Sequence, residues 1–466
     1  MFFSVFPARY ICLERSLISS MSNLERASKL GLFTLAWPIF LEQFLRIMIN
    51  YVDVFMLGHY SDDAVAATGV ANQVLTISII MYGFISVGVQ ILVAQMIGAK
   101  KPQMIDRIIT NGIVVAFLIG VIMSVVFLLF SSSFLRALGL NEHLVETGLP
   151  FLQIIGGSSL IIAIHSAILP ILRTYGYVRQ AMFVPITISV INVIGNYLFL
   201  YGPLSYLDMG VAGVGISTAI ANLVGMVMAI ILLQKLIGYR FSFKKIQEVS
   251  RKLLGSILRL GLPSAGENLS YAGSQLVVTA IVAILGSEAL TTKVYASSVS
   301  QFVALFSIAI GQASQIMIGR AVGAKEVDKA YKQGLRSWKI GLIISISVSI
   351  CIYVFSEPIM HLFTSNATII QMTKQLFLLA ILLEIGRATN IILISSLNAT
   401  GDVRFPFIVG IIVMWIVSLP FSYVLGISAG LALVGVWIAY IIDEGVRALM
   451  MYRRWRSKVW SLRSII

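Results

Sequence analysis

Long apolar stretches dominate the chain and are separated by short breaks that contain charged residues, glycine or proline. Each stretch reaches the roughly 20 residues that a helix needs to cross a lipid bilayer. None alternates over about ten residues in the way that is typical of an outer-membrane strand. The pattern predicts an all-α, polytopic membrane protein with 12 transmembrane helices, at about 30–57, 66–97, 105–133, 146–172, 178–201, 211–236, 256–285, 292–319, 333–356, 369–397, 405–427 and 430–451.

The composition agrees with a membrane protein. Of the 466 residues, 58% are hydrophobic and 12% are charged, whereas roughly 25% of a soluble domain is charged. One soluble core of this chain length could not bury so many apolar side chains, so they must face lipid. No separate catalytic domain fits, and the sequence has no Walker loop, nucleophile elbow or catalytic cluster. We therefore expect no enzyme.

The net charge of +14 would suggest nucleic acid as a partner in a soluble protein. With both termini on one side of the membrane, however, only Arg136, Lys293 and Lys374 lie in loops on the opposite side. The positive-inside rule then places both termini in the cytoplasm, as an extension at 1–29 and a basic tail at 452–466. The excess of basic residues therefore indicates which loops are cytoplasmic, and we expect no nucleic acid partner.

The chain also repeats itself at a fixed interval of 225 residues. The matches are Pro38 and Glu42 with Pro263 and Glu267, Gly98-Ala99-Lys100 with Gly323-Ala324-Lys325, and Gly176-x-Val178-Arg179 with Gly401-x-Val403-Arg404. Three separated matches at one offset indicate a duplication. Six spans in each half give two parallel six-helix repeats. We predict an N-lobe at 30–236 (helices 1–6), a cytoplasmic inter-lobe linker at 237–255 and a C-lobe at 256–451 (helices 7–12).

The first span carries Glu42, Arg46, Asn50 and Asp53 on one helix face, since they are spaced by four, four and three residues. Charged side chains at membrane depth must be paired or hydrated, so this face should not meet lipid. Glu42 and Arg46 could simply neutralise each other as an i, i+4 pair. Asp53 has no basic partner at helical spacing, which makes it a candidate functional carboxylate.

The fifth span places Asn192 and Asn196 one turn apart, with Asn196 at about the depth of Asp53. Their amides could hydrogen-bond a carboxylate or coordinate a cation. They could equally serve only to join neighbouring helices. The two interpretations stay open.

In the second half, Glu267 lies near the middle of the seventh span without a nearby partner. Glu384 and Arg387 are spaced i, i+3 in the tenth span and are predicted to form a structural ion pair. The two cysteines, Cys12 and Cys351, match no metal or redox spacing. We expect no metal cluster or disulfide, and we interpret His165, which lacks partners at ligand spacing, as a packing residue.

Several motifs together resemble the multidrug and toxic compound extrusion (MATE) family of transporters, of bacterial type, over residues 28–452. They are LAWPIFLEQ, NYVDVFMLG, DDAVAATGVA, QMIGAKK, LGLPSAGENLSY, LGSEALTTKVYA, IGQASQIMIGRAVGAK and LNATGDVRFPF. The resemblance implies a monomer with two lobes around a central cleft, in the bacterial plasma (inner) membrane. It also implies antiport of small organic cations or other amphiphilic drugs against H⁺ or Na⁺, with no further cofactor and with membrane lipid as surroundings.

The resemblance assigns roles to single residues. Asp53 follows Pro38 by fifteen residues, as the coupling-ion carboxylate of the family does, so Na⁺ could bind there. Asn192 matches the fifth-helix pattern, whereas Asn196 replaces an acid. In some relatives an acid stands where this chain has Tyr271, and one branch has Asp in place of Arg387. The residues expected to line the substrate cavity are Glu42, Gln43, Asn50, Glu267, Tyr271, Glu384 and Arg387.

The main alternative is a flippase for lipid-linked oligosaccharides or lipids from the same superfamily, which would share the repeat. Such proteins usually need a larger cationic cleft. The intramembrane bases here are Arg46, Arg387 and Arg447, and acids lie near two of them. An ion channel is disfavoured because no filter-like loop occurs.

Overall fold

The fold was analysed in a computed structural model, which describes residues 30–242, 245, 247 and 249–463. Within these ranges the chain is helical and contains no strand, so the predicted all-α class is confirmed. The main helices are α2 (Leu32–Tyr60), α3 (Asp62–Gly98), α4 (Pro102–Ala137), α5 (Glu142–Gly157), α6 (Ser159–Thr174), α7 (Val178–Leu200), α8 (Gly210–Leu232), α10 (Arg251–Ile284), α11 (Ser287–Gly323), α12 (Val327–Val354), α13 (Ser356–His361), α14 (Ala367–Thr400), α15 (Arg404–Val413), α16 (Leu419–Tyr423) and α17 (Ala432–Arg456).

Twelve membrane-spanning segments can be counted in the described residues, as predicted. Nine are single apolar helices long enough to cross a bilayer, and α5 with α6 forms a tenth that is bent by 46°. The other two, α10 and α17, have 34 and 25 residues but a more polar composition. The bend after Gly157 was not predicted, since hydropathy alone does not mark a break inside an apolar stretch.

The eleventh span is also less regular than its hydropathy suggests. Between α15 and α16 the backbone forms a π-helix at Met414–Ser418, and a second follows at Val424–Ser428. Such wide turns insert a residue into the helical ladder and change which face the later side chains present.

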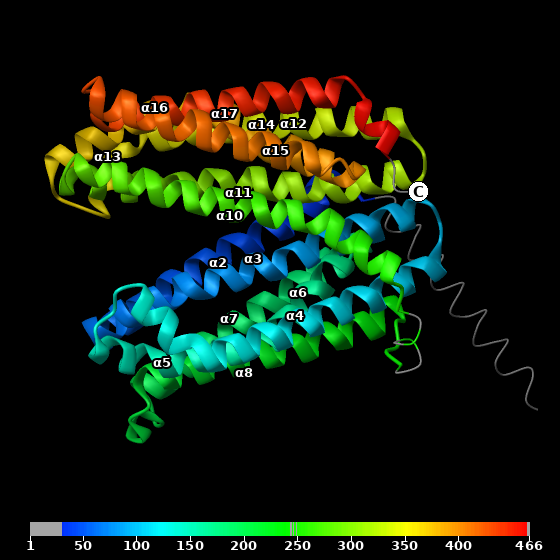
Figure 1. The fold of residues 1–466 in the computed structure, drawn as a ribbon, viewed down its shortest axis with the longest axis horizontal. Helices are drawn as coiled ribbons and strands as arrows, with labels where there is room; N and C mark the ends of the chain where they lie inside the picture. The colour runs from blue at the N-terminus through cyan, green and yellow to red at the C-terminus, as the bar shows by residue number, and fades with distance from the viewer. Residues whose placement is uncertain (1–29, 243–244, 246, 248, 464–466) are drawn as a thin grey trace, which may run out of the picture. The chain divides into compact units, whose positions relative to one another are not determined.

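The chain divides into two compact units (Figure 1). One contains Leu41–Gly261, and the other contains Leu32–Phe40 and the residues from Leu262 onward. In the first unit, α3 packs against α4, α5 and α6, and α8 packs against α5, α6 and α7. In the second, α14 packs against α11, α12 and α17. The division falls inside α10, between Gly261 and Leu262. The helix itself begins earlier, at Arg251, which lies within the predicted linker 237–255.

The backbone repeats the duplication found in the sequence. Both α3 and α11 have 37 residues, and they end at Gly98 and Gly323, the first residues of the repeated motif. Lys100 and Lys325 both have left-handed backbone conformations, with φ of 55° and 61°. Few residues other than glycine adopt this conformation. Its recurrence 225 residues later shows that the repeated motifs fold alike.

Helix starts follow the same duplication. Asn141 accepts a hydrogen bond from the Leu144 amide at 2.9 Å, and Asn366 accepts one from the Thr368 amide at the same distance. Each asparagine caps the helix that follows it, because its side chain satisfies an amide that lacks a partner within the helix.

The segment predicted as a basic tail is instead packed against the second unit over its first part. Helix α17 continues to Arg456, and the Trp455 and Trp460 rings are fully buried and stacked with centroids 4.6 Å apart. They belong to an apolar cluster that includes Leu393 and Leu397 of α14. The extension at 1–29 lies outside the described residues.

Candidate functional site

The structure joins Asp53 of α2 to Asn196 of α7. The Asn196 side-chain amide donates to Asp53 Oδ1 at 2.8 Å, and it also lies 3.3 Å from Asn192 Oδ1. Asn196 is 1% exposed and Asn192 is 5% exposed, whereas Asp53 is half-buried. All three residues that the sequence proposed for ion coupling therefore lie together. Asn192 and Asn196 are one turn apart on α7, and Asn196 contacts Asp53 on α2.

Further polar side chains extend this contact toward α8 and α6. The Asn192 amide donates to Thr218 Oγ1 at 2.8 Å. Asn222, one turn further along α8, donates to the Thr218 carbonyl at 2.8 Å, and its Oδ1 lies 3.3 Å from His165 Nε2. We call these six residues the polar network: Asp53, Asn192, Asn196, Thr218, Asn222 and His165.

Two atoms of the polar network are buried and have no hydrogen-bond partner among the described residues, Asn196 Oδ1 and His165 Nδ1. A buried carbonyl oxygen without a donor is costly, on the order of 1–3 kcal/mol. Asn196 Oδ1 therefore has free capacity to accept a proton donor or to coordinate a cation beside the Asp53 carboxylate.

Glu42 and Arg46 of α2 do not pair with each other as their spacing allowed, and each has another partner. Glu42 forms a buried ion pair with Arg173 of α6, not with Arg46. Arg46 instead donates to Gln43 Oε1 at 2.5 Å. Asn50 is exposed and makes no hydrogen bond among the described residues. Sequence spacing could not find the partner of Glu42, because Arg173 follows the predicted span 146–172 and the two residues are 131 positions apart.

In the second unit, Glu384 and Arg387 of α14 form the predicted ion pair. A second charged cluster, which the sequence analysis missed, lies on α17: Arg447 contacts Asp443 and Glu444 at 2.8 Å each. Asn390 of α14 connects the helices by donating to Glu444 Oε2 at 2.5 Å. The i, i+3 and i, i+4 spacing of the α17 residues was the available signal.

Glu267 of α10 differs from Glu42, its counterpart in the repeat. It is half-buried and forms no ion pair within 4.0 Å among the described residues. Helix α15 passes close to it at Gly410, where an added Cβ would lie 3.4 Å from Glu267 Oε1. Tyr271, one turn further on α10, is 45% exposed. Among the clustered acids Glu267, Glu384, Asp443 and Glu444, only Glu267 thus lacks an ion pair with an arginine in the described part of the chain.

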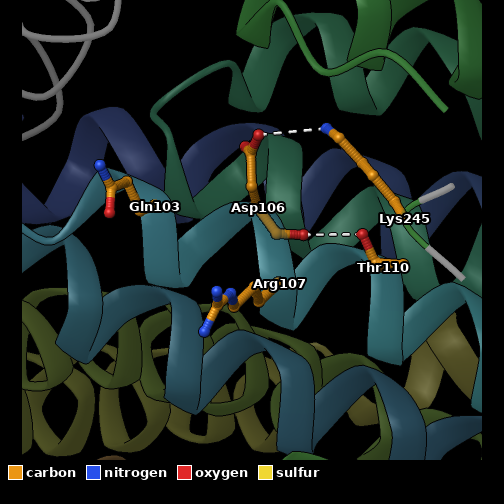
Figure 2. A pocket seen from close by; sticks show the side chains of 5 residues that line it. All are labelled: Gln103, Asp106, Arg107, Thr110 and Lys245. Carbon is orange, nitrogen blue, oxygen red and sulfur yellow. Dashed lines mark hydrogen bonds and ion pairs between the residues drawn. The ribbon is translucent and has the colours of Figure 1, made fainter. Parts of the chain in front are cut away.

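A separate polar pocket of 240 Å³ lies where the linker meets the start of α4 (Figure 2). Lys245 reaches Asp106 at 3.2 Å, and the Tyr239 hydroxyl lies 2.8 Å from Thr110 Oγ1. Burial raises the pKa of the Tyr239 hydroxyl above its ordinary value of 10.0. The hydroxyl therefore stays protonated at neutral pH, and these contacts dock the linker onto the first unit.

Comparison with known proteins gives three consistent results. A family model described as MatE matches residues 38–198 and 263–424, two segments that begin 225 residues apart. The uncharacterized transporter YisQ of Bacillus subtilis is 38% identical over 96% of this chain and 99% of its own length. The probable multidrug resistance protein NorM of Thermotoga maritima is 25% identical over 93% of this chain and 94% of its own.

A solved structure shares the fold. It is described as the outward-facing conformation of a multidrug resistance MATE family transporter of the MOP superfamily. The TM-score is 0.86 at 20% identity, over 93% of this chain and 96% of that one.

Proposed function

The chain belongs to the MatE family of membrane transporters, and on this premise we propose that it is a secondary active multidrug antiporter. It exports organic cations and other amphiphilic drugs in exchange for H⁺ or Na⁺ by alternating access. Relatives named as multidrug resistance proteins support this substrate class. The basic loops support a cytoplasmic location for both termini, and we propose that the spans lie in a bacterial plasma membrane.

The observation that carries the proposal is the contact between Asp53 and Asn196. A carboxylate at membrane depth is stable only if it is paired or hydrated, yet Asp53 has an amide, not a cation, as its hydrogen-bond partner. Binding of H⁺ or Na⁺ would supply the missing positive charge. Asn196 Oδ1, which lacks a donor among the described residues, would then accept the new proton or coordinate the ion.

Charge exchange at Asp53 would be coupled to conformation through the polar network. Neutralising the carboxylate weakens its hydrogen bond with Asn196, because charge-assisted bonds are stronger than neutral ones. Asn196 is linked through Asn192 to Thr218 on α8, so the change reaches the packing of α7 against α8. A conformational equilibrium shifts only if the ion binds its two states with different affinity, and this linkage supplies such a difference.

We propose that the Glu267 carboxylate attracts cationic substrates. The neighbouring acids Glu384, Asp443 and Glu444 are all paired with arginine, whereas Glu267 is not. Within this group of acids, a delocalised organic cation would therefore find one carboxylate that is not held in an ion pair.

The experiment is ethidium efflux from cells that express the wild type or Asp53→Asn. We expect the variant to insert in the membrane normally but to lose efflux. The matched control is Asp208→Asn, which removes an exposed loop carboxylate and should leave efflux unchanged. Normal efflux by Asp53→Asn would contradict the proposal.

A further inference from the structure

One face of α12 changes from basic to apolar along its length. Positions 329, 332, 336 and 339 follow each other along α12 at steps of three or four, so they share one helix face, and position 325 lies just before the helix begins. All five are basic and exposed, and we call them the basic stripe: Lys325, Lys329, Lys332, Arg336 and Lys339. The same face continues with the exposed side chains of Ile343, Ile350 and Val354.

Most of the basic stripe has no protein counter-charge. Lys329 contacts Glu326 at 2.8 Å, whereas Asp328 is occupied by Lys458 at 2.8 Å. Within the described part of the chain, the side chains of the other four members make no hydrogen bond or ion pair, although Lys332 also acts electrostatically on Asp328. A pocket of 360 Å³ lies along the stripe, lined by Lys329, Lys332, Gln333 and Arg336.

This charge works against the helix that carries it. The first turn of a helix has a partial positive charge, so cations there are unfavourable. Helix α12 begins at Val327, and Lys329 and Lys332 lie in its first two turns. Of these two, only Lys329 lies in the first turn, where Glu326 and Asp328 already offset part of the repulsion, and an external anion would offset more of it.

The length of α12 places the basic stripe at the depth of the lipid headgroups. With 28 residues, α12 is about 42 Å long at 1.5 Å per residue, whereas the hydrocarbon core of a bilayer is about 30 Å thick. If Val354 lies at one edge of the hydrocarbon, the other edge falls near residue 335. The basic stripe then lies at headgroup level, with Lys339 able to extend toward it.

The duplicated helix α4 shows that the basic stripe is not an inherited requirement of the fold. Residues 225 positions earlier keep the exposed apolar half, as Leu118, Ile122, Val125 and Leu129. The basic half is mostly absent, since the equivalent positions are Lys100, Met104, Arg107, Asn111 and Val114. The uninterrupted row of basic residues therefore occurs on α12 and not on α4.

We propose that the basic stripe of α12 is a binding site for the headgroup of an anionic phospholipid, whose acyl chains lie along Ile343, Ile350 and Val354. Clustered Lys and Arg beside a membrane span attract acidic lipids by about 1 kcal/mol per residue. A free phosphate ion would use the basic half only, whereas a phospholipid uses both halves of this face. The site belongs to the second unit and shares no residue with the polar network, so it depends only on the membrane location of the chain.

Native mass spectrometry of the purified full-length protein tests this site, with phosphatidylglycerol and phosphatidylcholine as probes. We expect the wild type to bind phosphatidylglycerol at least about tenfold more tightly than phosphatidylcholine. The variant Lys332→Gln/Arg336→Gln/Lys339→Gln should lose this preference. The control Lys100→Gln/Lys101→Gln/Lys252→Gln, which removes three exposed charges elsewhere, should keep it.

Two further arms complete the test. The charge-preserving variant Lys332→Arg/Lys339→Arg should bind as the wild type does, which separates loss of charge from misfolding. Millimolar glycerol phosphate, which lacks acyl chains, should not displace the lipid. The proposal would be overturned if the wild type bound the two phospholipids equally or if glycerol phosphate displaced the lipid. It would also be overturned if the α12 triple variant kept the preference, or if either of the other two variants lost it.

Discussion

Asp53 on α2 and Asn196 on α7, 143 positions apart, are joined by a hydrogen bond of 2.8 Å. The carboxylate accepts from the amide nitrogen, and the amide oxygen has no donor among the described residues. This pairing leaves the negative charge of Asp53 uncompensated by any cation within hydrogen-bond distance, and it places a vacant acceptor beside it. Both properties are what a reversible site for H⁺ or Na⁺ requires.

Asn196→Leu should impair transport more than it impairs folding. The substitution keeps the side-chain size but removes the donor to Asp53, and a hydrogen bond to a charged group contributes about 1.5–3 kcal/mol. We expect ion-driven efflux to fall at least about tenfold. Thr187→Val is the matched control, since the Thr187 hydroxyl bonds only its own helix backbone at Phe183. Equal efflux rates in the two variants would exclude a role for this contact.

The buried pair of Glu42 and Arg173 should behave as one unit in stability measurements. Arg173→Gln leaves the Glu42 charge buried without its partner, which should cost about 3–5 kcal/mol. The double variant Glu42→Gln/Arg173→Gln should recover most of this loss. Thermal unfolding in detergent gives the comparison, and purely additive effects would show that the pair is not coupled.

Glu267→Gln should weaken transport of cationic drugs selectively. It removes the one acid of the second unit's charged cluster that has no arginine partner. We expect the apparent KM for ethidium to rise about fivefold, whereas transport of an uncharged amphiphile should change little. Glu357→Gln, at an exposed acid on the short helix α13, serves as control. An equal effect on both substrates would contradict a charge-based role.

Thr110→Val should loosen the linker from α4. The substitution removes the partner of the Tyr239 hydroxyl, which is 2.8 Å away and buried, and costs about 1 kcal/mol. Limited trypsin digestion should then cleave within the linker several times faster than in the wild type. Thr76→Val, at an exposed threonine that bonds its own helix, should cleave at the wild-type rate. Cleavage of Thr110→Val at that same rate would mean that the contact does not hold the linker.

The sequence predicted the helices and their duplication because both leave local traces. Hydropathy marks each span, and the 225-residue offset recurs in the left-handed Lys100 and Lys325. The depth of Asn196 relative to Asp53 also followed from counting helical rise. Their functional roles, and those of the cavity residues, stay predictions.

Other features could not be predicted because they depend on contacts between distant helices. Glu42 has an obvious neighbour in Arg46 at helical spacing, yet packing gives it Arg173 instead. Thr218 and Asn222 are ordinary residues of an apolar helix until α7 packs beside Thr218 and α6 packs beside Asn222. The bend between α5 and α6 and the burial of Trp460 likewise arise from packing, which a composition window does not contain.

The most direct measurement of the central claim is drug transport in proteoliposomes under a proton gradient and a sodium gradient imposed separately. The account predicts that at least one gradient drives transport by the wild type. In Asp53→Asn neither gradient should do so, although exchange of drug for drug without a gradient should persist. Gradient-driven transport by Asp53→Asn at the wild-type rate would contradict the account.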